Sequence, residues 1–429
     1  PLITGYGNTP LKARAADGQV TQALWRKVAD NGAIYLDAYE GWYALRDECF
    51  YGEDELVAGP DGKKVAPTGA PVEWVKEPSY FFRLSDYQDR LLELYEQHPE
   101  FLGPHGARNE IISFVKQGLR NLSISRTSFK WGIPVPGDEQ HVMYVWFDAL
   151  ANYLSALGYP DADAPRMAYW PASLHLVGKD IARFHAIYWP AFLMAAGIDL
   201  PKKVFANGWW TIEGQKMSKS LGNVVDPREL VAEFGLDAVR FFVLREVPFG
   251  GDSDLSRKAL ITRNNVELAN DLGNLAQRTL SLVARNCGGI LPERRMLTED
   301  DAKLLGQVVV LPQLLAAQFE RCALTDALED VWKVIRACNA YIDHQAPWAL
   351  RKTDVERMAD VLRVLLDALR GIATMLQPFM PDSMARMLDQ LGVTQDERTF
   401  AALEVALPGG RQLPAPQGIF PRYVEPEQS

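Results

Sequence analysis

The sequence is poor in cysteine, which limits the chemistry it can carry. Its 429 residues contain four cysteines, Cys49, Cys287, Cys322 and Cys338, and no Cys-x-x-Cys pair. Four scattered thiols cannot build a disulfide framework, and a zinc knuckle would lack its ligand pairs. We therefore expect idle or buried thiols in a reducing cytoplasm, no metal site and no structural zinc.

Long apolar runs and an excess of positive charge are also absent. We find no stretch apolar enough to span a bilayer and no opening signal peptide, so a cytoplasmic protein is expected. The net charge of −10 argues against a non-specific nucleic-acid binder, which would be basic. A local basic surface would still suffice to dock an RNA.

The first third of the chain is predicted to be mixed. Residues 21–31, 84–97 and 110–119 have helical patterns, and Gly32 is expected to end the first of these helices. Between residues 34 and 121, short aromatic and β-branched runs alternate with turn signals. We interpret this region as a small, partly β insertion.

The pattern changes after residue 142. Short apolar runs at 142–146, 174–177 and 204–206 alternate with helical patterns at 148–157 and 181–196. Strands that alternate with helices predict βαβ units and a parallel sheet.

From about residue 255 the pattern is almost entirely helical, which predicts a helical bundle. Apolar side chains recur at helical spacing, as in Val331, Trp332, Ile335, Cys338 and Ile342. Thr353 and Glu356 form a capping-box signature before the segment 361–376. The proline-containing residues 404–429 are expected to drape over other parts of the chain.

The strongest chemical signal is Lys216-Met217-Ser218-Lys219-Ser220. Two lysines three residues apart, with a serine between them, give a loop that can neutralise charge growing on a leaving pyrophosphate. On these five residues alone, a solvated lysine loop is the alternative.

Two further motifs accompany this loop, Tyr144-Val145-Trp146-Phe147-Asp148-Ala149 and His175-Leu176-Val177-Gly178-Lys179-Asp180. With them the sequence resembles the bacterial methionyl-tRNA synthetases from about residue 22 to 424. The resemblance implies an α/β Rossmann-like class I synthetase core with an incomplete N-terminal half, followed by an all-α anticodon-binding helical bundle. It also implies ATP-dependent ligation of methionine to tRNA(Met) through methionyl-adenylate, with Mg²⁺ accompanying ATP.

The same resemblance implies a division of the chain into six parts. They are an N-terminal remnant (1–21), a connective insertion (22–129), the second half of the catalytic domain (130–225), a stem-contact linker region (226–256), the anticodon-binding domain (257–403) and a C-terminal tail (404–429).

The resemblance places an ATP site on three segments. Lys219 is expected to stabilise the pyrophosphate with support from Lys216, and Met217 and Ser218 lie in the same loop. Gly178, Lys179 and Asp180 are expected to contact the adenosine, since glycine permits close approach and a carboxylate accepts from ribose hydroxyls. Arg126 matches an arginine near the ATP. A helix N-cap aspartate and a surface arginine are the alternatives.

The methionine pocket is expected to contain Trp146, Ala149, Tyr153, Ile181 and His185. An aromatic lining suits the polarisable thioether of methionine. Tyr153 and His185 resemble the pair that hydrogen-bonds the sulfur in the family. Without that context, core packing is the usual role of such residues.

Asn270, Asn274 and Arg278 are four residues apart and share one helix face. Amides and a guanidinium can bind base edges, and Trp348 offers a flat surface for an unstacked base. The family uses these residue types to recognise the CAU anticodon. On spacing alone, an exposed polar helix face with a half-buried tryptophan is the alternative.

The sequence departs from the family in one respect. None of its six histidines are three residues apart, so the His-x-Gly-His motif that contacts ATP phosphates is absent. A truncated or incompletely recorded chain, a degenerate paralogue and a split protein are the three explanations, and we expect weak methionine activation from these residues alone. Asn207 also stands where relatives commonly have histidine.

Two other functions therefore stay open at this point. One is a non-catalytic tRNA-binding paralogue or fragment, and the other is a methionine or adenylate sensor. The oligomeric state is not determined by the sequence, and a monomer is favoured.

Overall fold

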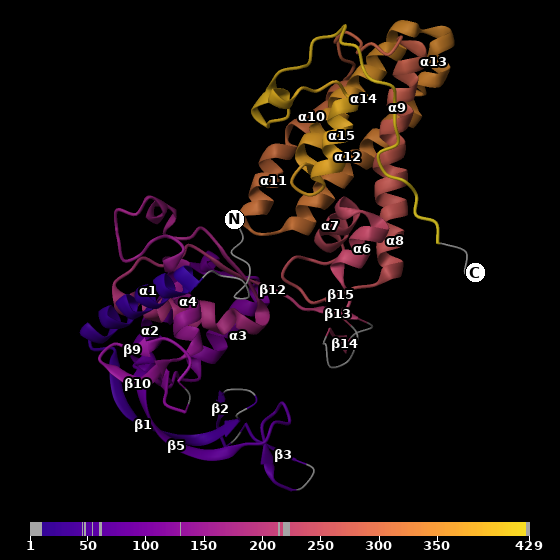
Figure 1. Cartoon of the computed structure of the whole chain (residues 1–429). Coiled ribbons are helices and arrows are strands. Elements are labelled where there is room, and N and C mark those ends of the chain that lie inside the picture. The colour runs from indigo at the N-terminus through magenta and orange to yellow at the C-terminus, as the bar shows by residue number, and fades with distance from the viewer. Residues whose placement is uncertain are drawn as a thin grey trace. The chain divides into compact units, whose positions relative to one another are not determined.

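The computed structural model describes residues 11–44, 46, 49–53, 55–59, 62–128, 130–212, 215–217 and 224–425. The chain divides into two compact units, Pro1–Asn207 and Gly208–Ser429, which are coloured by residue number in Figure 1.

The first unit opens with α1 (Leu11–Asp30), which begins ten residues before the predicted start. Its first half has little apolar periodicity, but alanine, leucine, lysine and arginine favour a helix without it. The predicted end is confirmed. Gly32 has φ 75°, a conformation that glycine adopts without steric cost, and its N–H donates to the Ala29 carbonyl at 2.8 Å.

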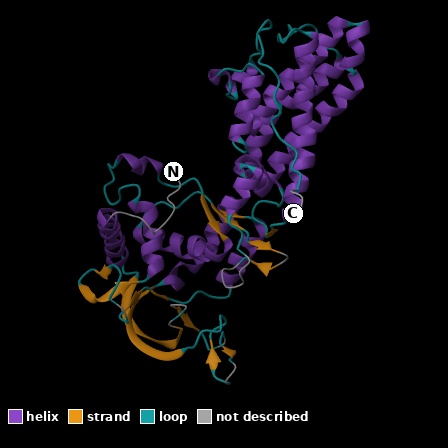
Figure 2. Ribbon diagram, turned by 45° about the vertical axis from the view of Figure 1, so that its right-hand side comes forward, coloured by secondary structure: helices purple, strands orange, loops and turns teal. Residues whose placement is uncertain are grey.

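A curved antiparallel hairpin follows, visible as the long strands in Figure 2. It pairs β1 (Ile34–Ala44) with β5 (Glu73–Phe82). Short strands on either side give the order β2-β1-β5-β7, with β2 at Cys49–Tyr51 and β7 at Leu122–Ser123. The predicted β content of this region is confirmed, and its assignment as an insertion stays a prediction.

The remaining elements of this unit are shorter. They are β3 (Val57–Ala58), β4 (Lys64–Val65), η1 (Leu84–Tyr87), α2 (Gln88–Gln97), η2 (Pro99–Phe101), β6 (Leu102–Gly103), α3 (His105–Lys116), β8 (Ser125–Arg126), β9 (Pro134–Val135), β10 (Asp138–Met143), α4 (Val145–Ser155), η3 (Pro165–Tyr169), β11 (His175–Gly178), η4 (Lys179–Ile181), η5 (Phe184–Tyr188), α5 (Trp189–Ala196) and β12 (Val204–Asn207).

A parallel sheet forms as predicted, in the order β11-β12-β6. The two residues of β6 come from the segment expected to be insertion and pair with β12. The helices α1, α4 and α5 meet in the core of this unit, where Trp25 and Phe192 each pack against Phe147 with ring centroids 5.3 and 4.8 Å apart. This packing fixes α4, which carries Trp146, Ala149 and Tyr153 of the predicted methionine pocket, and α5, which directly follows the turn η5 that carries His185.

Two predicted boundaries in this unit were wrong. Residues 145 and 146 belong to α4 rather than to the preceding strand, because Tyr144 is the last extended residue. The predicted helix at 181–196 is interrupted by η5, a π-helical turn that holds one extra residue per turn.

The second unit begins with a small sheet in the order β14-β13-β15. Its other elements are helical, as Figure 2 shows. The unit contains β13 (Trp210–Ile212), β14 (Gln215–Lys216), α6 (Pro227–Phe234), α7 (Leu236–Arg245), β15 (Ser253–Asp254), α8 (Arg257–Arg263), the π-helical η7 (Asn264–Gly273), α9 (Asn274–Asn286), α10 (Glu299–Val309), α11 (Leu311–Glu320), α12 (Leu324–Gln345), α13 (Pro347–Thr353), α14 (Val355–Leu376), α15 (Pro381–Gln390), η8 (Gln395–Glu397) and η9 (Ala401–Glu404).

The helical bundle is confirmed by burial. All five residues singled out in 331–342 are fully buried, as the helical spacing predicts. The tail also packs as expected, since Leu407, Leu413 and Ile419 belong to the same core.

The predicted cap of α14 was wrong by one residue. Asp354, not Thr353, accepts from the N–H of Arg357 at 2.9 Å, and the helix begins at Val355. Aspartate and threonine are both good N-caps, so the sequence alone did not separate them.

We expected no segment apolar enough to span a membrane. By length and composition, one segment contradicts this expectation. Glu299–Glu320 passes the test of length and hydropathy. It consists of α10 and α11, and Leu304, Leu305, Leu311 and Leu315 pack into the helical core. Such packing is what a core helix pair of a folded domain shows.

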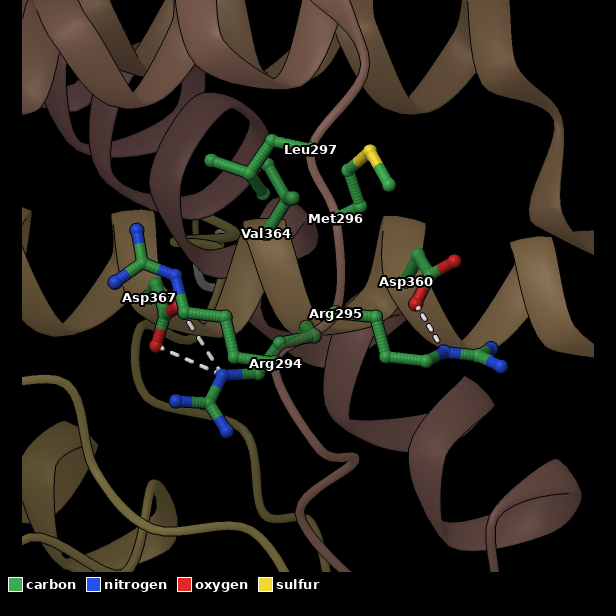
Figure 3. A pocket seen from close by; sticks show the side chains of 8 residues that line it. Arg294, Arg295, Met296, Leu297, Asp360, Val364 and Asp367 are labelled. Atoms are coloured by element: carbon green, nitrogen blue, oxygen red, sulfur yellow. Dashed lines mark hydrogen bonds and ion pairs between the residues drawn. The ribbon is translucent and has the colours of Figure 1, made fainter.

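Arginines tie the loop before α10 to α14, as Figure 3 shows. Arg295 Nε binds Asp360 Oδ1 at 2.9 Å, and Arg294 Nε lies 3.9 Å from Asp367 Oδ2. Arg363 is 1% exposed and donates to the carbonyls of Pro292 and Leu407. One buried guanidinium therefore holds both this loop and the C-terminal tail on α14.

We expect the core of the helical unit to dominate its stability. Leu369→Ala removes a fully buried side chain of α14 and should lower the free energy of unfolding by about 2–5 kcal/mol. Leu314→Ala, at a side chain 43% exposed, should change it by less than about 0.5 kcal/mol. Urea unfolding followed by circular dichroism measures both, and equal losses would contradict this packing.

Candidate functional site

The carboxyl ends of the parallel strands lie at one edge of the sheet. The register places Gly178 opposite Asn207, and β6 ends nearby at Gly103. Open α/β sheets bind ligands at this edge. Gly178 ends β11 there, and Lys179 and Asp180 follow it in the turn η4.

Gly178 is required by its neighbour. A Cβ at this position would lie 2.5 Å from Asp180 Oδ1, so any side chain would displace the carboxylate. Asp180 is exposed to solvent at the end of the strand. The pair therefore presents a carboxylate close to bare backbone, which suits sugar hydroxyls.

The predicted methionine residues form an aromatic cage. The ring of Trp146 on α4 stacks on Phe184 with centroids 3.7 Å apart and an interplanar angle of 8°. The His185 ring lies edge-on to Trp146 at 6.5 Å and to Tyr153 at 5.6 Å. Ala149 lies on α4 and Ile181 ends η4, so all five predicted residues belong to two adjoining segments.

A relay of two hydrogen bonds fixes the polar members of the cage. His185 Nδ1 lies 3.0 Å from the carbonyl oxygen of Ile181, which can only accept, so Nδ1 carries the proton. His185 Nε2 then accepts from the Tyr153 hydroxyl at 2.7 Å. The single hydroxyl proton of Tyr153 is thus directed at His185.

Burial keeps this relay uncharged. It lowers the pKa of His185, against the opposing effect of the Ile181 carbonyl, and it raises the pKa of the Tyr153 hydroxyl. Near neutral pH the cage therefore holds a neutral imidazole and a protonated phenol. Such a lining favours an uncharged ligand side chain over a charged one.

The sequence did not identify His175 as a site residue, although it opens one of the quoted motifs. Its ring lies 4.3 Å from that of Tyr153, and its Nε2 accepts from Trp189 Nε1 at 3.3 Å. Burial and the nearby His185 lower its pKa to about 4. Its neighbours in the sequence, Leu174 and Leu176, gave no signal of this role, because Trp189 and Tyr153 approach it only in the fold.

The π-helical turn η5 explains why His185 reaches Tyr153. Phe184 and His185 both lie in it, and π-helical turns are frequent at functional sites. The extra residue shifts the side chains that follow relative to an α-helix. Phe184 therefore stacks on Trp146 while His185 bonds to Tyr153.

Arg126 is buried on β8. Its guanidinium donates to the Ser123 hydroxyl and the Ser125 carbonyl, both at 2.7 Å, and lies 5.1 Å from the ring of Tyr144. It is therefore not the surface arginine that was the alternative. Its proposed contact with ATP stays a prediction.

The lysine loop belongs to the second unit. Lys216 is the last residue of β14, and the N–H of Met217 donates to the Trp210 carbonyl at 3.3 Å. Ser218, Lys219 and Ser220 lie outside the described residues. The predicted approach of Lys219 to the ligand stays a prediction.

The predicted RNA-binding residues of the helical unit lie on adjoining helices. Asn270 on η7 and Asn274 on α9 are exposed, and among the described residues their amides have no hydrogen-bond partner. Arg278 binds Asp343 at 2.7 Å, and its Cζ lies 5.3 Å from the ring of Trp348 on α13. The structure thus brings Arg278 and Trp348 together across 70 residues of sequence.

No group of three or more metal-ligating side chains occurs in the described part of the chain. The side chain of Cys49 is not among those described. The expected absence of zinc stays a prediction.

Known proteins resemble this chain along nearly all of its length. Residues 6–280 match the family "tRNA synthetases class I (M)", and residues 291–429 match "Anticodon binding domain of methionyl tRNA ligase". A methionine–tRNA ligase of Brucella suis biovar 1 is 54% identical over 411 residues, which are 96% of this chain and 80% of the relative. One from Mesorhizobium japonicum is 54% identical over 94% of this chain and 78% of its own length.

Two solved structures have the same fold. Mycobacterium tuberculosis methionyl-tRNA synthetase in complex with methionyl-adenylate is 48% identical, with a TM-score of 0.91 over 97% of this chain and 83% of the other. Its apo form is 46% identical, with a TM-score of 0.91 over 99% of this chain and 85% of the other.

The lowered pKa of His175 predicts a pH dependence of stability. Between about 6.5, the pKa of an unfolded histidine, and about 4, the unfolded state binds more protons than the folded state. The free energy of unfolding should therefore fall as pH is lowered through this window. His175→Gln should flatten that slope in urea unfolding, whereas His98→Gln, at an exposed histidine, should not. An unchanged slope in His175→Gln would contradict the neutral, buried imidazole.

Proposed function

The chain belongs to the methionyl-tRNA synthetase family of class I, and on that premise we propose which of its residues bind methionine, ATP and tRNA. The protein is a methionine–tRNA ligase with a class I catalytic core and an anticodon-binding domain. The non-catalytic tRNA-binding protein is not favoured at this level of identity.

The reaction has two steps. The carboxylate of methionine attacks the α-phosphate of ATP, which forms methionyl-adenylate and releases pyrophosphate. A hydroxyl of the 3′-terminal adenosine of tRNA(Met) then takes the acyl group and AMP leaves. The protein mainly positions reactants and neutralises charge, and Mg²⁺ enters with ATP.

We propose that the cage of Trp146, Ala149, Tyr153, Ile181 and His185 holds the methionine side chain. The observation that carries this assignment is the relay from Tyr153 through His185 to the Ile181 carbonyl. It locks the Tyr153 ring against His185, whose ring lies edge-on to Trp146, without placing a charge in the cage. Because the Tyr153 and His185 protons are already donated within the relay, the thioether would meet polarisable ring surfaces rather than a hydrogen-bond donor, and such surfaces suit sulfur.

On the nucleotide side, we propose that Asp180 accepts hydrogen bonds from the ribose hydroxyls while Gly178 and Lys179 face the adenosine. The exposed carboxylate at the sheet edge supports this role. Lys219 would stabilise the pyrophosphate with support from Lys216, and Met217 and Ser218 of the same loop would bind ATP. We propose separately that the buried Arg126 binds ATP.

In the helical unit, we propose that Asn270, Asn274, Arg278 and Trp348 bind the CAU anticodon. Two amides without partners in the described chain and an indole 40% exposed support this assignment. We further propose the six domain boundaries given above and an insertion without zinc. We also propose a cytoplasmic location and a monomeric state.

We also propose that the phosphate-contacting histidines of the family are not supplied by these 429 residues. Residues 1–429 contain no two histidines three apart. In addition, among the described residues β11 pairs with another strand on one side only. Leu174, just before β11, is 38% exposed, and Leu176, on β11, is 53% exposed. An exposed leucine on an edge strand is typical of a surface that another element covers.

The methionine site can be tested by removing one hydroxyl. Tyr153→Phe breaks the relay and leaves a buried imidazole nitrogen without its donor, so methionine should bind about 5–20-fold more weakly. Equilibrium dialysis with labelled methionine measures this directly. Tyr188→Phe, a matched hydroxyl deletion in the π-helical turn that carries His185, should bind methionine as the wild type does. Equal affinity of Tyr153→Phe and wild type would refute the assignment.

The histidine proposal predicts slow adenylation. Methionine-dependent ATP–pyrophosphate exchange by the 429-residue chain should be about 100-fold or more slower than that of the Brucella suis relative, because charge stabilisation of this kind contributes about that much. Methionine binding to the same preparation shows that the protein is folded. Exchange at the relative's rate would overturn the proposal.

A further inference from the structure

The turn between α12 and α13 carries Trp348 and has an unusual backbone. Ala346 adopts the left-handed conformation, with φ 45° and ψ 58°, and Pro347 starts α13 directly after it. A left-handed conformation disfavours a residue with a Cβ by about 1 kcal/mol or more. Contacts from outside the turn must therefore hold the left-handed conformation of Ala346. Without them the backbone would relax and Trp348 would move.

Gln345, the last residue of α12, supplies the attachment. Its Nε2 donates to Asp300 Oδ2 at 3.1 Å, and its Oε1 accepts from the Arg357 guanidinium at 2.9 Å. Asp300 lies on α10 and Arg357 on α14. One half-buried amide thus ties the turn to two other helices.

The Arg357 guanidinium is itself fixed by a fully buried carboxylate. It binds both oxygens of Asp301, at 2.6 and 2.7 Å, in a bidentate pair. Asp301 also accepts from the Tyr341 hydroxyl at 2.5 Å and from the Thr298 N–H at 3.1 Å. Burial alone would raise the pKa of Asp301, but the bonds from Arg357 and Tyr341 outweigh it and hold the pKa well below its usual range.

The other end of the turn meets the proposed anticodon face. Trp348 lies beneath the Arg278 guanidinium, and Arg278 also binds Asp343 on α12. A stacked indole and guanidinium lose little freedom when a base is added, because their geometry is already set.

We propose that Gln345, held by the Arg357–Asp301 pair, is a positioning residue for anticodon recognition, which acts by fixing the Ala346 turn so that Trp348 stays stacked with Arg278. This inference rests on the proposed role of Trp348. Gln345 itself need not contact the RNA. Its loss should weaken tRNA binding while leaving methionine binding in the first unit unchanged.

A double-mutant cycle tests the proposal. Fluorescence anisotropy with labelled tRNA(Met), at one fixed salt concentration, measures the affinity of the full chain and of the variants Gln345→Ala, Trp348→Ala and the double variant. We expect Trp348→Ala to bind about 10–100-fold more weakly. Gln345→Ala alone should bind about 3–10-fold more weakly, but in the Trp348→Ala background it should change affinity by less than about twofold.

Gln318 offers a matched control. Gln318 lies on α11, and its amide donates to Asp330 on α12 and accepts from Arg321, so it bridges an aspartate and an arginine just as Gln345 does. Gln318→Ala should leave tRNA affinity unchanged. The ¹⁹F resonance of Trp348 in protein labelled with 5-fluorotryptophan should shift in Gln345→Ala and stay in place in Gln318→Ala.

The outcomes separate the two claims. If Trp348→Ala binds tRNA normally, the proposed anticodon site is wrong. If Trp348→Ala weakens binding but Gln345→Ala has no effect, or the two effects are independent, the positioning role of Gln345 is wrong while the site stands.

Discussion

The hydrogen bond from Tyr153 to His185 is the interaction on which the proposed chemistry depends. It exists because the Ile181 carbonyl takes the only proton of the imidazole at Nδ1, which leaves Nε2 to accept. The imidazole of His185 stays neutral because burial lowers its pKa. Trp146 stacks on Phe184 and lies edge-on to His185, and the ring of a second neutral imidazole, His175, lies 4.3 Å from that of Tyr153.

In the helical unit, a pair of charged side chains fixes the position of the proposed functional residues. Asp301 and Arg357 form a pair that is costly to separate, since either partner alone would be a buried unpaired charge. Through Gln345 this pair holds a backbone conformation that would otherwise be unfavourable. In both units a π-helical segment carries a proposed functional side chain, the buried His185 in η5 and the exposed Asn270 in η7, and π-helical turns are frequent at functional sites.

Apolar periodicity predicted the parallel sheet and the helical bundle, whereas the residues of the cage came from the resemblance to the family and not from spacing. The sequence did not predict β6, since two residues have no measurable period, nor η5, since an extra residue in a helix leaves no composition signal. His175 was missed because its role depends on Trp189 and Tyr153, which approach it only in the fold. Similarly, Asp300 and Arg357 lie 45 and 12 residues from Gln345, and no local pattern connects them.

A crystal structure of the protein with methionine bound would test the central claim most directly. The thioether sulfur should lie in the cage, in contact with the Trp146 and Tyr153 rings, while the Tyr153–His185 bond and the Nδ1 contact with Ile181 are kept. Methionine bound elsewhere, or a relay broken by an inward-turned His185, would contradict it.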